Sequence, residues 1–406
     1  MNVIFITQSD INSINEKGIY ATLMRKFNTE GHQVYIISPA ERRQGQETHI
    51  IDYEGAKILK VKTLNIQKTN VVEKGIGILL IENQYKSAIK KYLGNVRFDV
   101  ILYSTPPITF TNVVRFLKKR NPQAISYLLL KDIFPQNAVD IGMFGEKSIF
   151  NWYFRKKEVE LYKTSDYIGC MSPANVEFLL KHNDFVDNKR VEVAPNAIEL
   201  KEKKFEDDQE KAERYYIRMK YGLPTDVPIF IYGGNLGKPQ GIDYLIKCLD
   251  ANKHRQDCFF VVIGNGTEFN KLSNWYDANI NCSVKLMQRL PEEDYDMLAR
   301  SCNVGLIFLD HRFTIPNYPS RLLGYLENKM PVLCATDVNT DIGRIAEENG
   351  YGYWCESVKP EDFTSLVDKM LTADRKAMGE KGHQFLCENY TVEKTYNAIV
   401  SHIVQC

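Results

Sequence analysis

The chain has 406 residues, more than one ordinary hydrophobic core accommodates, which predicts two or more domains. Apolar residues make up 44% and charged residues 25%, and the formal net charge of +1 argues against a dedicated nucleic-acid binder, which would carry a basic excess. Nine cysteines without a C-x-x-C pair predict free thiols in a reducing compartment, and argue against a disulfide framework or a zinc site.

The first residues, Met1–Ile6, have the pattern of a strand and lack the basic region and cleavage site of a signal peptide. The longest apolar stretch, residues 75–81, is far shorter than a membrane span. We therefore expect a cytoplasmic protein, whose contact with the inner face of the membrane would be peripheral.

Short runs of β-branched and aromatic residues recur along the chain, separated by stretches of helix length. They lie at residues 3–7, 34–38, 99–104, 125–130, 166–171 and 190–194, and then at 228–232, 258–263, 283–287, 304–309, 331–335 and 351–355. Continuous apolar runs are typical of parallel strands that are covered on both faces. Two such alternating sets predict two doubly wound α/β domains.

We place the domain boundary between Pro195 and Pro228, where the charged stretch 199–220 has the composition of a solvated linker running into a helix. The expected domains are residues 1–195 and 196–391. Residues 392–406 form a helix pattern of their own, and we expect this helix to pack back on the first domain.

In doubly wound sheets, ligands bind beyond the carboxyl ends of the strands. The glycine-rich run 233–241 follows one predicted strand, so its backbone can approach a ligand closely, and the next helix start suits phosphate. Lys238 adds a full positive charge there. Gly264 and Gly266 follow the next strand. Alone they are weak evidence, but the repetition of a glycine motif at equivalent positions of one domain favours binding over simple turn chemistry.

A third junction, residues 313–332, carries a Pro-Ser pair that begins a helix, which Ser320 or Asn317 is expected to cap. Arg321 then falls in the first turn, where a cation opposes the helix dipole by roughly 0.3–1 kcal/mol. A bound anion would explain this charge; the alternative is an ordinary surface arginine.

In the first domain, Asp132 stands at the end of a fully apolar strand. A carboxylate at this position is placed to act on a ligand bound in the cleft. The alternative is an aspartate that caps a helix or a turn. The turn 15–18 after the first strand faces the same side, so that Gly18 is expected to line the cleft.

Taken in order, these junctions resemble the retaining glycosyltransferases of family 4, which have the GT-B fold. The resemblance covers nearly the whole chain and rests on the segments 31–34, 165–172, 194–199, 233–241, 264–266, 289–291, 302–304 and 319–332. The junction 131–135 is most similar to the branch that serves capsule and O-antigen assembly, including amino-deoxy-sugar transferases.

The resemblance implies two Rossmann-like doubly wound domains facing a central cleft. The first would bind a glycan or a polyprenyl-diphosphate-linked saccharide as acceptor, and the second a nucleotide-sugar donor, UDP-linked in our expectation. It implies transfer of an amino- or deoxy-hexose with retention of configuration in bacterial surface polysaccharide (capsule, O-antigen, lipopolysaccharide) biosynthesis, usually without a metal. No cofactor is expected.

Because the family pattern supplies no clear nucleophile, catalysis would rest on positioning and on stabilising the leaving diphosphate. Lys238, Arg321 and the helix start at Ser320 are the candidates for that role. Asp132 occupies the position where many relatives carry a catalytic-site histidine, so it would orient or deprotonate the acceptor hydroxyl. The expected donor-binding residues are Gly18, Gly234, Asn235, Gly237, Gly264, Asn265, Gly266, Arg289, Leu290, Pro319, Ser320 and Glu327.

The chain departs from the family pattern at two places. The positions of the usual E-x7-E pair hold Pro316 and Gly324, and the usual Arg and Lys of the glycine-rich run are Asn235 and Gln240. Glu327, one turn after Gly324, would partly replace the lost carboxylate by accepting hydrogen bonds from the ribose. A non-catalytic paralogue, and a UDP-sugar 2-epimerase of the same fold, remain as alternatives.

Residues 150–157 interleave aromatic and basic side chains, and residues 115–120 form a second basic cluster. Such a surface suits anionic lipid headgroups. The alternative is that the aromatic rings face the core while the lysines face water.

Overall fold

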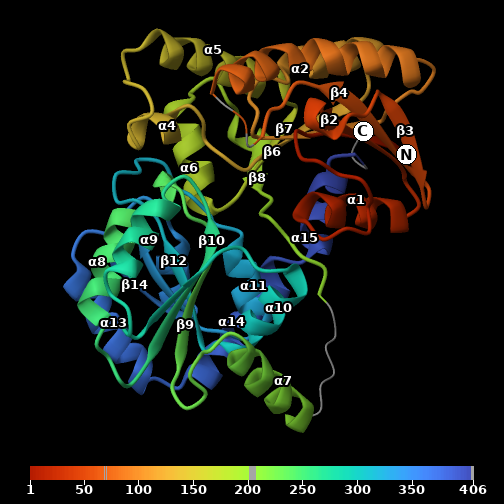
Figure 1. The fold of residues 1–406 in the computed structure, drawn as a ribbon. Helices are drawn as coiled ribbons and strands as arrows, with labels where there is room; N and C mark the ends of the chain where they lie inside the picture. Colours follow the sequence, from red (N-terminus) through yellow and green to blue (C-terminus); the bar gives the residue numbers. More distant parts are fainter. Residues whose placement is uncertain (68, 70, 201–206, 404–406) are drawn as a thin grey trace. The chain divides into compact units, whose positions relative to one another are not determined.

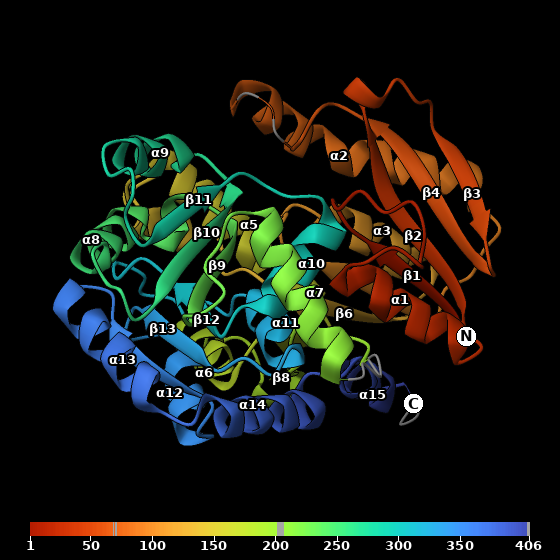
Figure 2. The ribbon, with the colours of Figure 1, turned by 60° about the horizontal axis from the view of Figure 1, so that its bottom comes forward.

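The computed structural model describes residues 1–67, 69, 71–200 and 207–403. It divides into two compact units: an N-terminal unit formed by Met1–Glu199 with Thr391–Cys406, and a C-terminal unit formed by Leu200–Tyr390. Each unit is a sheet flanked by helices (Figures 1 and 2). None of the helices in the described ranges combines the length and the apolar character that crossing a bilayer requires.

The N-terminal sheet has eight strands in the order β3-β4-β2-β1-β5-β6-β7-β8, all parallel except β3, which runs antiparallel to β4. Its strands are β1 (Asn2–Ile6), β2 (Gln33–Glu41), β3 (His49–Tyr53), β4 (Ala56–Thr63), β5 (Val100–Ser104), β6 (Ile125–Leu130), β7 (Tyr167–Cys170) and β8 (Val191–Val193). The central strands β1, β5 and β6 are buried except at Asn2, because helices cover both faces.

Helices cover this sheet in two layers. One layer holds α2 (Val71–Tyr92), α3 (Thr111–Arg120) and α5 (Ile149–Thr164), whose apolar side chains share one core cluster with the sheet. The opposite core cluster contains α1 (Ile19–Thr29) and the C-terminal α15 (Val392–Ser401). The unit is completed by α4 (Gln136–Asp140) and α6 (Pro173–His182).

The C-terminal sheet has six parallel strands in the order β11-β10-β9-β12-β13-β14. Its strands are β9 (Ile229–Asn235), β10 (Phe259–Asn265), β11 (Val284–Met287), β12 (Val304–Phe308), β13 (Val332–Thr336) and β14 (Gly352–Glu356). Its helices are α7 (Asp207–Lys220), α8 (Ile242–Asn252), α9 (Phe269–Asp277), α10 (Glu292–Ser301), α11 (Arg321–Glu327), α12 (Ile342–Glu348), α13 (Pro360–Thr372) and α14 (Arg375–Asn389). Figure 2 shows α12, α13 and α14 along one border of the unit.

The predicted α/β class is confirmed, and each of the twelve predicted strands coincides with an observed one. Two strands, β3 and β4, were missed because β3 is a half-exposed edge strand and lysines interrupt the apolar run of β4. The glycine-rich runs were predicted to begin after their strands had ended, but Gly233–Asn235 and Gly264–Asn265 continue β9 and β10 as paired strand residues. Part of the predicted charged linker, residues 201–206, and the end of the predicted C-terminal helix, residues 404–406, lie outside the described residues.

Candidate functional site

The two glycine motifs of the C-terminal unit lie side by side at the carboxyl ends of β9 and β10. A Cβ on Gly264 would come within 1.8 Å of the Gly234 oxygen, and one on Gly266 within 2.2 Å of the Leu236 oxygen. The Leu236 amide donates to the Asn265 oxygen at 3.0 Å. Close packing of two backbone segments therefore requires these glycines, a role that the sequence motif alone did not reveal.

Arg321 lies against this backbone platform. Its guanidinium stacks over the Tyr232 ring at 4.2 Å, and a Cβ on Gly234, which has φ +130°, would lie 3.5 Å from its Nη2 atom. Its Nη1 atom is buried and has no hydrogen-bond partner, and no carboxylate of the described residues pairs with the side chain. Because a buried guanidinium nitrogen without an acceptor is costly, the geometry favours an anionic ligand here.

Two further tyrosines, which the sequence did not single out, shape the surroundings of Arg321. The Tyr325 hydroxyl donates to the Ile231 oxygen at 3.1 Å and accepts from the Gly233 amide at 3.2 Å. Tyr295 covers Gly233 so closely that a Cβ there would meet its hydroxyl at 1.9 Å. The tyrosines supply bulk and neutral oxygens but no countercharge, so the positive charge of Arg321 stays uncompensated.

The start of α11 differs from the prediction. Ser320 occupies the N-cap position, but its backbone is helical (φ −65°, ψ −14°) and its side chain makes no capping hydrogen bond. A capping side chain normally requires an extended backbone at that position, which explains the difference. Asn317 does not replace it, because it lies three residues before the N-cap position. Its backbone amide donates to Thr340 Oγ1 at 3.0 Å, and its side-chain Nδ2 atom is buried without a hydrogen-bond partner among the described residues. Pro319 is half-buried and precedes the exposed Ser320.

Asn235 and Gln240, which stand where the family pattern has Arg and Lys, contact each other. Asn235 Nδ2 donates to Gln240 Oε1 at 3.0 Å, and the Gly237 amide donates to the same oxygen at 3.2 Å. The two departures thus form one local pair that closes the segment 235–240, within which Lys238 lies. Lys238 itself is exposed and has no ion-pair partner within the described ranges.

The remaining predicted donor residues lie at neighbouring loops or on α11. The Arg289 amide donates to Asn265 Oδ1 at 3.4 Å, and Leu290 beside it is half-buried. The Arg289 side chain is exposed without an ion pair among the described residues. Glu327 is half-buried at the end of α11, and open space surrounds the position of a Cβ on Gly324. The structure therefore shows no close backbone packing that would require glycine at 324.

In the N-terminal unit, Asp132 lies two residues after the end of β6. Thr105 Oγ1 accepts from the amides of Lys131 at 2.9 Å and Asp132 at 3.1 Å, which fixes this backbone. Lys131 turns away and donates to the Ala194 oxygen at 2.8 Å. The Asp132 carboxylate has no partner in the described part of the chain, and burial raises its pKa to about 6. It does not cap α4, whose N-cap residue is Pro135.

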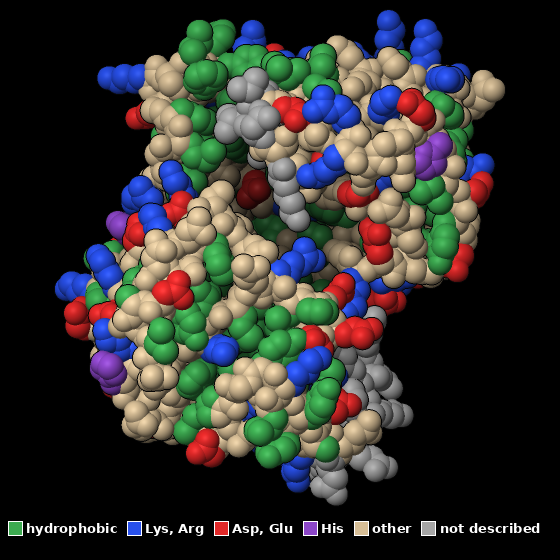
Figure 3. Space-filling model, viewed as in Figure 1, with side chains coloured by type: hydrophobic (Ala, Val, Ile, Leu, Met, Phe, Trp, Pro, Cys, Tyr) green, Lys and Arg blue, Asp and Glu red, His purple; other side chains and the backbone are tan. Residues whose placement is uncertain are grey.

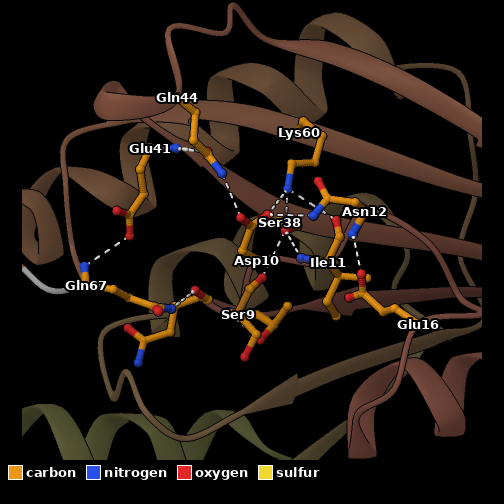
Figure 4. Close-up of polar contacts among 12 residues, drawn as sticks. Ser9, Asp10, Ile11, Asn12, Glu16, Ser38, Glu41, Gln44, Lys60 and Gln67 are labelled. Carbon is orange, nitrogen blue, oxygen red and sulfur yellow. Dashed lines mark hydrogen bonds and ion pairs between the residues drawn. The ribbon is translucent and has the colours of Figure 1, made fainter. Parts of the chain in front are cut away.

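The loop that joins β1 to α1 and ends at Gly18 is held by a buried lysine (Figure 4). Lys60 on β4 is fully buried and donates to the Asp10 carboxylate, to the Ile11 oxygen at 3.2 Å and to Ser38 Oγ at 3.3 Å. Ser38 Oγ in turn accepts from the Ile11 amide at 2.9 Å. This loop begins at the carboxyl end of β1, the side of a doubly wound sheet where ligands bind. The lysine therefore holds part of the chain at that side of the sheet.

Asp10 is tied to its neighbours as well, since it accepts from Gln44 Nε2 at 2.6 Å and from Asn12 Nδ2 at 3.3 Å (Figure 4). The Ser38 hydroxyl donates to the Ser9 oxygen at 2.9 Å. Sequence reasoning missed this network because the lysine-rich pattern of β4 resembles a surface strand. Gly18, the predicted cleft residue, is exposed and precedes α1 with φ +146°, a backbone that favours glycine.

Residues 213–385, most of the C-terminal unit, match the family described as Glycosyl transferases group 1. The chain is 24% identical over 298 residues to the probable glycosyltransferase WbjE of Pseudomonas aeruginosa, covering 73% of this chain and 72% of that protein. It is 24% identical over 154 residues to the putative colanic acid biosynthesis glycosyl transferase WcaI of Escherichia coli (strain K12), covering 37% and 36%.

Solved structures with the same fold cover almost the whole chain. Sucrose-phosphate synthase from Thermosynechococcus elongatus superposes with a TM-score of 0.74 at 13% identity, covering 100% of this chain and 98% of that one. HepE of Anabaena, solved in complex with UDP, gives 0.68 at 11% identity, with 100% of both chains covered. The chain has the GT-B fold, and its C-terminal unit is similar to group 1 glycosyl transferases. These matches support a glycosyltransferase of this group.

The packing of Gly264 can be tested against that of Gly324. Gly264→Ala is expected to destabilise the protein by about 1–3 kcal/mol, because its Cβ would overlap the Gly234 oxygen. Gly324→Ala has open space and a helical position, so it should be neutral or stabilising by up to about 1 kcal/mol. Urea midpoints of the two variants check this; equal midpoints would contradict the packing described for β9 and β10.

The Lys60 network can be tested with a neighbour on the same strand as control. Lys60→Met keeps the side-chain length but removes the buried donor, which should cost about 1–3 kcal/mol and speed amide hydrogen exchange in residues 8–18. Lys62→Met removes an exposed ion pair with Glu47 and should cost less than about 1 kcal/mol. Unchanged exchange in residues 8–18 of Lys60→Met would show that the loop is held by other contacts.

Proposed function

We propose that the protein transfers a sugar, an amino- or deoxy-hexose, from a UDP-sugar to a glycan or polyprenyl-diphosphate-linked saccharide, with retention of configuration. The observation that carries the proposal is the unpaired guanidinium of Arg321 beside Gly234, in the unit that matches group 1 glycosyl transferases. The UDP complex of HepE and the colanic acid assignment of WcaI support the donor and a role in bacterial surface polysaccharide biosynthesis.

In this proposal, Arg321 and Lys238 stabilise the negative charge that develops on the leaving diphosphate. Three cations at the strand ends, Lys238, Arg289 and Arg321, lack carboxylate partners within the described ranges, so an anion would meet an uncompensated positive field. Preorganised donors of this kind need little rearrangement during the reaction. The remaining donor contacts are assigned to Gly18, Gly234, Asn235, Gly237, Gly264, Asn265, Gly266, Leu290, Pro319 and Ser320.

Glu327 is proposed to accept hydrogen bonds from the ribose hydroxyls of the donor. The open space at Gly324, three residues earlier on the same helix, leaves room for a ligand where the family pattern has a carboxylate. Charge-assisted hydrogen bonds of this kind contribute about 1.5–3 kcal/mol each.

Asp132 is proposed to orient the acceptor hydroxyl and to take its proton. The anomeric carbon exchanges its bond to the diphosphate oxygen for a bond to the acceptor oxygen, and the diphosphate leaves with the electron pair. A carboxylate with a pKa of about 6 and no partner among the described residues is mostly ionised at neutral pH and can accept this proton.

We place the reaction in the cytoplasm, at the inner face of the membrane when the acceptor is lipid-linked. The eight cysteines of the described ranges are free thiols, and most of them are buried, which supports a reducing compartment.

The role of Arg321 predicts a loss of donor affinity on its replacement. Arg321→Met keeps much of the side-chain volume and should weaken UDP binding by about 1.5–3 kcal/mol, roughly tenfold to a hundredfold, since charge-assisted hydrogen bonds are lost. Arg344→Met is the control, because Arg344 is exposed and pairs with Glu348 on α12. Isothermal titration with UDP gives both affinities; wild-type affinity in Arg321→Met would remove Arg321 from the site.

The role of Asp132 predicts that kcat/KM rises with pH through an apparent pKa of about 6, because only the ionised carboxylate accepts a proton. Asp132→Asn should lower kcat by about 10²–10⁴-fold while UDP affinity stays unchanged. UDP release measured between pH 5 and 8 checks both statements. Full activity of Asp132→Asn would refute the assignment.

The raised pKa of Asp132 also makes the free energy of unfolding depend on pH. Since burial raises the pKa of Asp132, the folded state favours the protonated form, and the stability from this group is present below about pH 4 and lost as the pH rises through 6. Asp132→Asn should therefore be at least as stable as the wild type at pH 8. Unfolding of the variant at pH 8 would point to a structural role instead.

A further inference from the structure

The helical layer formed by α2, α3 and α5 is strongly basic. Together these three helices carry twelve Lys and Arg residues and four Glu residues, whereas the whole chain has a net charge of only +1. They cover the same face of the N-terminal sheet, since α3 contacts both α2 and α5. The excess positive charge of the chain is therefore concentrated on one layer of one unit.

Large apolar side chains are exposed near the N-terminal ends of α2 and α5. These ends lie on the side of the sheet where the carboxyl ends of the strands are. At the start of α2 they are Ile76, Leu79 and Leu80, which are 47%, 57% and 42% exposed. In and before the first turn of α5 they are Met143, Ile149, Phe150 and Trp152, which are 65%, 74%, 62% and 64% exposed. Figure 3 shows hydrophobic side chains gathered over α5 and the start of α2, with Lys and Arg side chains beside them.

For the stretch 150–157, the sequence allowed either a lipid-binding surface or aromatic rings that face the core. The structure shows some of these rings in the core and others exposed. Phe154 packs into the unit, with its ring centroid 4.9 Å from that of Phe134, whereas Phe150 and Trp152 face outward. In the basic cluster 115–120, Lys118 is held by Asp166 at 2.5 Å, but Arg115 and Lys119 are exposed. The exposed rings thus have no role in the core of the unit.

A shallow hollow of about 540 Å³ lies beside these rings. Trp152, Lys147, Arg155 and Lys156 line it, together with one carboxylate, Glu146. The Lys156 ammonium lies 5.8 Å from the centre of the Trp152 ring, and neither Lys147 nor Lys156 has an ion-pair partner among the described residues. The ammonium groups can contact the anionic phosphate of a phospholipid. The aromatic ring beside them can contact the apolar glycerol and acyl region below that phosphate.

We propose that this face, made by α2, α3, α5 and residues 143–152, docks on an anionic phospholipid bilayer. The exposed Ile, Leu, Phe and Trp side chains enter the boundary between headgroups and acyl chains, while the lysines and arginines contact lipid phosphates. A nucleic acid would use the charge but would leave these aliphatic side chains unused. The inference concerns a surface of the N-terminal unit and does not depend on the transfer reaction.

Tryptophan fluorescence tests the proposal at a single position. The chain has three tryptophans, and the other two are engaged in the C-terminal unit: Trp275 donates to Asp250 at 3.0 Å and Trp354 to Thr336 at 2.9 Å. Vesicles of phosphatidylcholine with about a third phosphatidylglycerol should shift the emission of the wild type to the blue at low salt. The shift should vanish in Trp152→Phe and persist in Trp275→Phe. A shift that persists in Trp152→Phe would overturn the proposed face.

Vesicle co-sedimentation gives the affinity, with matched exposed positions as controls. Replacing Ile149, Phe150 and Trp152 by Ser should lower binding at least tenfold, and Lys147→Gln and Lys156→Gln about fivefold each. Ile280→Ser, 75% exposed in the C-terminal unit, and Lys376→Gln on α14 should bind like the wild type. No sedimentation of the wild type with anionic vesicles would refute the bilayer and leave a protein partner for this face. Equal binding to pure phosphatidylcholine would refute the proposed contacts between the basic side chains and anionic lipid. UDP titration of the same variants keeps this outcome separate from the proposed function.

Discussion

The C-terminal unit is organised around a positive charge that no carboxylate among its described residues neutralises. Arg321 stacks on Tyr232, and Tyr295 and Tyr325 fill the space near it, so its guanidinium is surrounded by neutral groups and keeps an Nη1 atom without an acceptor. A structural arginine would satisfy its donors within the protein, as Arg255 does with Asp257 and Asp368. An anionic ligand would supply the acceptor that Arg321 lacks, and the proposed roles of the neighbouring loops follow from that requirement.

Backbone packing holds the loops around this charge. Gly264 and Gly266 let the end of β10 lie directly against the chain that leaves β9, while Gly234 leaves room for the Arg321 guanidinium. The hydrogen bond from Asn235 to Gln240 closes the segment that contains Lys238, and it joins the two positions at which the family pattern has basic residues. The chain thus carries fewer basic residues here than that pattern, which makes the proposed donor site more dependent on Arg321.

The strands could be predicted because the central positions of both sheets are covered on two faces and therefore form continuous apolar runs. The same reasoning missed β4, in which Lys60 is buried by a network that only the tertiary structure brings together. It identified Arg321 from an unfavourable charge at a helix start, but it could not find Tyr295, which lies 26 residues earlier in a polar stretch of α10. It expected Ser320 or Asn317 to cap α11, but Ser320 at the N-cap position has a helical backbone and its side chain makes no capping hydrogen bond, and this backbone conformation is not readable from a local pattern. Residue types at strand ends are thus readable from sequence, whereas contacts between loops are not.

A structure of the protein with UDP tests the central claim most directly. The account predicts that oxygens of the diphosphate lie within hydrogen-bonding distance of the Arg321 guanidinium, with its Nη1 atom engaged, beside the backbone of Gly234. A diphosphate bound elsewhere on the chain, with Arg321 still without an acceptor or paired with a carboxylate, would contradict it.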